Sequence, residues 1–177
     1  IPYPTVLDPV MVSEHTQVTV ATGVEPTRGN RSVRLEQINL DNWVECSQLR
    51  VKPEQEHFVT SNLVCIAEVQ FYPEWRAYAI YDGDQMVGFT MLEFNEEEAW
   101  WISSLMIAAA FQGQGYGRLA LAALIALVAA QGCTALLVGY AHDNAVARNL
   151  YQRAGFVEVG LDDEGDMVAQ LKLAQQS

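Results

Sequence analysis

The sequence contains few of the residues that build metal centres or disulfide frameworks. Its 177 residues include three cysteines and three histidines, and none of them has paired or metal-ligand spacing. An odd number of cysteines without a pairing pattern is typical of a reducing compartment, so we expect a cytoplasmic protein with no metal site. Cys46, Cys65 and Cys133 are expected to be small hydrophobic residues rather than nucleophiles.

Long hydrophobic segments are also missing. The longest apolar run, Leu119 to Ala130, is too short for a membrane-spanning helix, which needs about 20 residues. The first residues, Ile1 to Pro4, have neither the basic nor the apolar region of a signal peptide. The chain does not begin with methionine, which leaves an upstream start open. We therefore expect no membrane partner.

Positive charge is scarce. Ten Lys and Arg residues stand against 22 Asp and Glu residues, which gives a net charge of −12. Such a surface repels nucleic acid, so we expect no nucleic-acid partner. The negative charge would attract cationic substrates such as amines. Acidity that only keeps the protein soluble is the alternative explanation.

The chain is long enough for one domain with a sizeable core. Residues 1–30 are rich in proline, contain one short β-like run from Gln17 to Val20, and are interpreted as an N-terminal extension. Residues 31–177 carry the regular patterns of a folded domain. Trp100 and Trp101 are expected on opposite faces of one strand, with one of them in the core.

Periodicity and turn residues predict the elements of this domain. Helices are expected from Asn42 to Leu49, from about Gln55 to Val69, over residues 117–131 and from Asn144 to Ala154. Strands are expected over Ser32–Ile38, Ala77–Tyr81, Met86–Phe94, Trp100–Ile107, Thr134–Ala141, Phe156–Val159 and Met167–Leu173. Turns are expected at Asp82–Asp84 and Asn95–Glu98. The last two helices are expected to end at Gly132 and Gly155. This order predicts an α/β fold with a mixed sheet.

A glycine-rich turn stands between the strand ending at Ile107 and the longest helix. It contains Gln112, Gly113, Gln114, Gly115, Tyr116 and Gly117. The first N–H groups of a helix lack intrahelical partners, and the helix dipole adds partial positive charge there. Glycines allow the backbone to approach an oxygen closely. The turn is therefore a candidate phosphate site.

A second motif follows about thirty residues later, where the chain reads Asn144-Ala145-x-Ala147-x-x-Leu150-Tyr151-x-x-x-Gly155-Phe156. Together the two motifs resemble the acetyl-CoA site of the GNAT acetyltransferase superfamily. The resemblance covers about Ser32 to Leu173 and implies that residues 31–177 form an acetyltransferase domain. The middle of the chain looks most like the bacterial spermine/spermidine acetyltransferases, for example in Phe71-Tyr72-Pro73-Glu74-Trp75.

The resemblance implies the fold and the site. The sheet would be mostly antiparallel, flanked by helices and splayed between its fourth and fifth strands. Acetyl-CoA would be the co-substrate and a small-molecule amine, in particular a polyamine, the acceptor. The protein is expected to form a homodimer. The residues implied in cofactor binding are Leu105, Met106, Ile107, Gln112, Gly113, Gln114, Gly115, Tyr116, Gly117, Arg118, Asn144 and Tyr151.

Tyr151 would be the general acid that protonates the leaving thiolate, and its alternative is a core tyrosine with a satisfied hydroxyl. Many relatives place a glutamate where this chain has Gly139. The base would then be Glu93 or Glu68 acting through water, or bulk solvent.

Two other functions stay open. Gly115-x-Gly117-x-x-Ala120 formally fits the Rossmann fingerprint of dinucleotide-binding proteins. Residues 136–140, however, lack the acidic residue that this fingerprint requires. A catalytically idle domain that binds coenzyme A is the other alternative.

Overall fold

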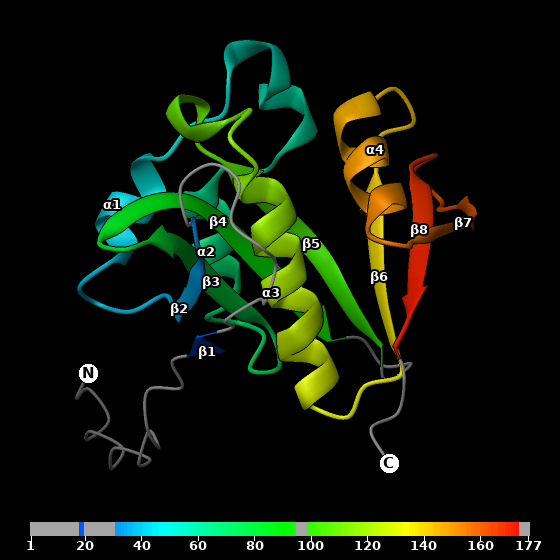
Figure 1. Cartoon of the computed structure of the whole chain (residues 1–177), viewed down its shortest axis with the longest axis horizontal. Coiled ribbons are helices and arrows are strands. Elements are labelled where there is room, and N and C mark those ends of the chain that lie inside the picture. The colour runs from blue at the N-terminus through cyan, green and yellow to red at the C-terminus, as the bar shows by residue number, and fades with distance from the viewer. Residues whose placement is uncertain (1–17, 20–30, 95–98, 174–177) are drawn as a thin grey trace, which may run out of the picture.

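The computed structural model of the chain describes residues 18–19, 31–94 and 99–173, and within these residues eight strands form one sheet. The strand order is β1-β2-β3-β4-β5-β6-β8-β7 (Figure 1). The strands are β1 (Val18–Thr19), β2 (Arg34–Gln37), β3 (Arg76–Asp82), β4 (Gln85–Phe94), β5 (Trp100–Ile107), β6 (Ala135–Tyr140), β7 (Val157–Leu161) and β8 (Met167–Lys172).

Helices cover both faces of this sheet (Figure 1). The α-helices are α1 (Trp43–Gln48), α2 (Asn62–Glu68), α3 (Tyr116–Ala130) and α4 (Ala145–Arg153), and the short 3-10 helices are η1 (Pro53–Phe58) and η2 (Ala109–Phe111). One core joins α3 and Tyr151 of α4 to the sheet, and a second core joins Cys46 of α1 and Cys65 of α2 to the other face. None of the described helices is long and apolar enough to span a bilayer.

The sheet separates into two halves between β5 and β6. These two strands are the parallel pair of the described sheet, and all other neighbouring strands are antiparallel. Their pairing covers only Trp100–Ile102 of β5 and Leu136–Val138 of β6. Beyond these residues the strands diverge. The expected mixed fold is confirmed. The predicted splay between the fourth and fifth predicted strands corresponds to the divergence of β5 and β6.

One detail of the predicted helices is wrong. The continuous stretch from Gln55 to Val69 is broken at Val59, which is extended, and Ser61 caps a new helix by accepting the N–H of Val64. On the outer side of α3, Ala122 and Ile125 are partly buried and line a cavity against α4.

The predicted helix ends at Gly132 and Gly155 are confirmed, with φ values of +78° and +94°. Trp100 lies in the core and Trp101 is half-buried on the opposite face, as expected. The predicted turn Asn95–Glu98 and all but Val18 and Thr19 of the N-terminal extension lie outside the described residues.

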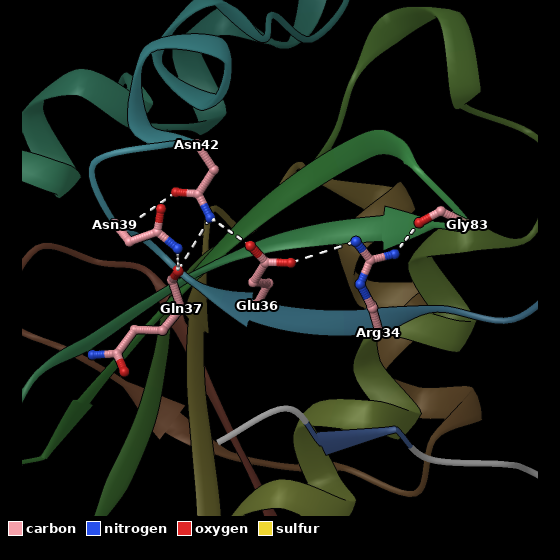
Figure 2. A network of polar contacts seen from close by, with 6 residues as sticks. All are labelled: Arg34, Glu36, Gln37, Asn39, Asn42 and Gly83. Carbon is pink, nitrogen blue, oxygen red and sulfur yellow. Dashed lines mark hydrogen bonds and ion pairs between the residues drawn. The ribbon is translucent and has the colours of Figure 1, made fainter. Parts of the chain in front are cut away.

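Asn42 stands at the expected helix start but does not cap it with its side chain. Its amide nitrogen instead donates to the carbonyl of Gln37 at 3.1 Å and to Glu36 at 3.3 Å. Figure 2 shows the resulting network of Arg34, Glu36, Gln37, Asn39, Asn42 and Gly83. Because Asn42 is buried, these bonds satisfy its amide and fix α1 against the end of β2.

Cys46 and Cys65 are fully buried in the second core. Burial raises the pKa of Cys46 to about 12 and that of Cys65 to about 11. Both thiols therefore stay protonated and inert at neutral pH, as the sequence indicated. Cys133 is partly exposed at the turn after α3.

Gly88 is the most tightly surrounded of the described glycines. A Cβ atom there would lie 2.4 Å from the backbone oxygen of Met106, which cannot move without disrupting β5. We predict that Gly88→Ala lowers the free energy of unfolding by about 1–3 kcal/mol, as overpacking does in well-packed cores.

Gly139→Ala is the matched control, because a Cβ at this strand position meets only Asp162 Oδ2, at 3.8 Å. Urea denaturation of both variants tests the prediction. Equal stability of the two alanine variants would contradict it.

Candidate functional site

A cavity of about 400 Å³ opens where β5 and β6 diverge. Its walls come from the glycine loop, the end of β5, α4 and the segment around η1. The lining residues are Val51, Lys52, Gln55, Phe58, Val59, Leu105, Met106, Ile107, Phe111, Gln112, Gly113, Gly115, Tyr116, Gly117, Asn144, Val146, Ala147, Leu150 and Tyr151. The structure thus brings both sequence motifs to one place.

The glycine loop enters α3 through left-handed backbone. Gly113 has φ +74° and Gly115, the residue preceding α3, has φ +91°. A Cβ at either position would meet no atom within 4 Å, so conformation rather than space requires glycine here. No side chain caps the start of α3, and its first N–H groups are therefore available at the cavity wall. The loop and the helix dipole together fit an anionic group.

Side chains of the loop hold it in place. Gln112 donates to the carbonyl of Ile107 at 2.9 Å and to Gln55 at 2.7 Å, which ties the loop to β5 and η1. The hydroxyl of Tyr116 donates to Asp82 at 2.6 Å. Arg31 lies over the Tyr116 ring, 5.6 Å from its centroid. The loop is therefore arranged before any ligand binds.

Two of the predicted cofactor residues do not line this cavity. The side chain of Gln114 turns back to the carbonyl of Ala110 and to Arg31. Arg118 is exposed and lines a second cavity of about 520 Å³ between α3 and α4, together with Arg153. Arg118 lies near the start of α3, and Arg153 is the last residue of α4. Both helices border the main cavity.

In the described sheet, the edge of β5 that faces the opening lacks a strand partner from Ser103 to Ile107. On its other edge β5 pairs with β4, with Ser103 as an extra residue between the pairs Met91↔Ser104 and Leu92↔Ile102. Unpaired backbone groups of a strand are ready hydrogen-bonding partners for an extended ligand. The predicted segment Leu105–Ile107 lies on this edge.

Asn144 precedes α4 and caps it. Its side-chain oxygen accepts the N–H of Ala147 at 3.0 Å. The same residue lines the cavity.

Tyr151 lies on the buried side of α4 and lines the cavity. Its ring stacks on Tyr140, with centroids 5.6 Å apart, and meets Phe156 edge-on at 5.4 Å. The hydroxyl of Tyr151 makes no hydrogen bond to any residue that the structure describes, and it is not sealed from the cavity. Within the described part of the chain, the alternative of a core tyrosine lacks the protein partner that would satisfy its hydroxyl.

Burial raises the pKa of Tyr151, and the neighbouring Tyr140 raises it further. Burial and the hydrogen bond to Glu158 raise the pKa of Tyr140 to about 12. Glu158 also pairs with Arg148, at 2.7 Å. The phenol of Tyr151 is thus protonated throughout the neutral range, which is the state required of a proton donor.

The two candidate bases lie outside this cavity, on the face of the sheet that α1 and α2 cover. Glu93 is half-buried on β4, and Glu68 ends α2. Burial and repulsion from Glu68 raise the pKa of Glu93, while the hydroxyl of Ser103 opposes the rise. The raised pKa makes the Glu93 carboxylate a better proton acceptor than an ordinary glutamate.

Sequence reasoning missed the wall that η1 and its flanks contribute. Lys52, Gln55 and Phe58 line the cavity, although only a helix beginning at about Gln55 was predicted for this part of the chain. The motif around Asn144 did not identify Val146 and Leu150 as lining residues either. In the sequence, the apolar character of these positions is indistinguishable from ordinary core packing. Among the described residues, no group of three His, Cys, Asp or Glu is placed to hold a metal ion.

Known proteins resemble this chain in sequence and in structure. The model of the acetyltransferase (GNAT) family matches residues 35–156. A spermine/spermidine N(1)-acetyltransferase of Bacillus subtilis is 28% identical over 146 residues, which cover 77% of this chain and 96% of that enzyme. The family match extends over both motifs and favours coenzyme A over a dinucleotide.

Solved structures share the fold at low identity. An acetyltransferase from Thermus thermophilus aligns with a TM-score of 0.67 and 20% identity, over 80% of this chain and 97% of the other. The PaiA N-acetyltransferase from Thermoplasma acidophilum, solved in complex with coenzyme A, aligns with a TM-score of 0.63 and 14% identity, over 80% and 99%.

Alkaline titration tests the surroundings of the tyrosine pair. Because folding raises both pKa values, the neutral phenols stabilise the fold fully below about pH 10, and this contribution is lost as the pH rises through the higher folded values. We predict that Tyr151→Phe leaves the tyrosinate absorbance of the folded protein unchanged up to about pH 11. In denaturant the same variant should lack one tyrosine that ionises near pH 10. A step near pH 10 that disappears from the folded variant would contradict the raised pKa.

Proposed function

The chain belongs to the GNAT acetyltransferase family and is an acetyl-CoA-dependent N-acetyltransferase, and on this premise we propose that its acceptor is a primary amine of a polyamine such as spermine or spermidine. The observation that carries the catalytic part of the proposal is the hydroxyl of Tyr151 in the cavity between the diverging strands, which bonds to no described residue. The relative from Bacillus subtilis is named for the same acceptors, and the net charge of −12 favours cationic substrates.

The cavity residues suit coenzyme A. In this proposal the N–H groups of residues 112–117 and the dipole of α3 hold the pyrophosphate, and Arg118 adds a charged contact from the outer side. The unpaired edge at Leu105–Ile107 hydrogen-bonds the pantetheine arm in place of a strand. Asn144 contributes its amide nitrogen. Acetyl-CoA supplies the activated acetyl group as a thioester.

We assign the proton transfers to two groups. Glu93, or Glu68 through water, accepts a proton from the acceptor ammonium, and the freed nitrogen forms the C–N bond as the C–S bond breaks. Tyr151 donates its phenolic proton to the departing sulfur, and the second proton of the new amide nitrogen passes through solvent to restore the phenol. A direct transfer is favoured because no cysteine lines the cavity.

Removing the phenolic hydroxyl tests the role of Tyr151. We predict that Tyr151→Phe lowers kcat by about 10²–10⁴-fold and leaves the affinity for coenzyme A within about twofold, since general acids contribute this much. The control is Tyr140→Phe, which makes the same chemical change in the stacked ring. Turnover of acetyl-CoA with spermine and spermidine measures kcat. Equal rates for wild type and Tyr151→Phe would contradict the assignment.

A pH profile separates the two candidate bases. Because the pKa of Glu93 is raised, the acid limb of kcat/KM is expected above the value of an ordinary glutamate. We predict that Glu93→Gln abolishes this limb and lowers kcat/KM by about 10²-fold or more, and that Glu68→Gln changes it less. The reverse order of effects would transfer the role to Glu68.

A catalytically idle protein gives a different result. It would bind coenzyme A, seen as a thermal shift that NAD does not produce, and turn over no amine. Such an outcome would overturn the proposed acceptor while keeping the assignment of the cavity.

A further inference from the structure

Position 139 leaves one wall of the opening without a side chain. Val138 and Tyr140 point into the core under α3 and α4, so position 139 faces the opposite side of the sheet. Gly139 is also the first residue of β6 beyond its pairing with β5. The bare backbone therefore lies at the point of divergence, on the same face as Glu93.

The carboxylate of Asp162 stands over this bare position. Its Oδ2 lies 3.8 Å from the place that a Cβ of Gly139 would take. Its Oδ1 accepts the N–H groups of Glu164 at 3.0 Å and Asp166 at 2.9 Å. These bonds fix the carboxylate in the β7–β8 turn, and no described residue donates to Oδ2. One oxygen is thus held in a constant direction and left free for a ligand.

Glu93 and Trp101 complete the same face. Glu93 of β4 pairs with Trp101 of β5, and Trp101 pairs with Leu137, two residues before Gly139. Strand β5, with the partly exposed Trp101, therefore lies between the strands of Glu93 and Gly139. Two strand spacings of about 4.8 Å separate Glu93 from Leu137, and Gly139 lies about 7 Å farther along β6, so the backbones at Glu93 and Gly139 are at least about 12 Å apart. Two carboxylates and a partly exposed indole on one face suit a cation with more than one charge.

We propose that Asp162 binds a second ammonium group of the acceptor, so that the site selects diamines and polyamines over monoamines. The inference rests on the proposed function, since it concerns the same acceptor. Glu93 serves the reacting nitrogen, and Asp162 holds the next nitrogen along the alkyl chain through the oxygen exposed over Gly139. Asp162 is a binding residue and takes no part in proton transfer.

A matched pair of acceptors tests this on the full chain. Putrescine and n-butylamine have the same carbon chain and differ in the second ammonium group. With saturating acetyl-CoA, we expect Asp162→Asn to raise the KM for putrescine about threefold to fivefold, the size of an exposed ion pair, with kcat unchanged within about twofold. The kinetic constants for n-butylamine should not move.

Asp163→Asn is the control, because it removes the same charge from the neighbouring position and should change neither KM. Asparagine at position 162 can still accept both backbone N–H groups through its oxygen, and thermal unfolding verifies the fold of each variant. An equal rise in KM for both amines, an equal effect of Asp163→Asn, or no effect at all would overturn the inference and leave the proposed function intact. If the wild type acetylates no amine, the proposed function fails, and the inference fails with it.

Discussion

Strands β5 and β6 pair over three residues and then part, and the candidate site depends on this interruption. On its far side β6 pairs with β8 over its whole length, so β6 follows the second half of the sheet while β5 stays with the first. The unpaired backbone of β5 would be a liability in an ordinary edge strand. Here it lines a cavity, and the interruption also connects the two faces of the sheet.

Helix α3 connects β5 to β6, and its start brings partial positive charge to the gap between these strands. It follows β5 and precedes β6, so its start lies at the open end of the gap. The left-handed Gly115 directs the first helical N–H groups to the cavity wall. Bonds from Gln112 and Tyr116 hold the loop from two sides. A site arranged in advance loses less conformational entropy when a ligand binds.

Local patterns in the sequence predicted most of this architecture. The helix ends at Gly132 and Gly155 and the cap at Asn144 depend on neighbouring residues, so a short window contains the needed information. The break at Val59 and the place of Asp162 over Gly139 depend on residues far apart in the chain. No window shows such contacts. For the same reason η1 was not expected to form a wall of the site.

The three cysteines allow local opening of the molecule to be measured by their reaction with a thiol reagent. Cys46 and Cys65 lie sealed beneath α1 and α2 with raised pKa values, while Cys133 is partly exposed. A thiol reagent can therefore modify Cys133 in the native state, whereas the other two react only when the helices detach from the sheet. The modification rate of Cys46 and Cys65 would measure how often α1 and α2 detach from the sheet, without any introduced cysteine.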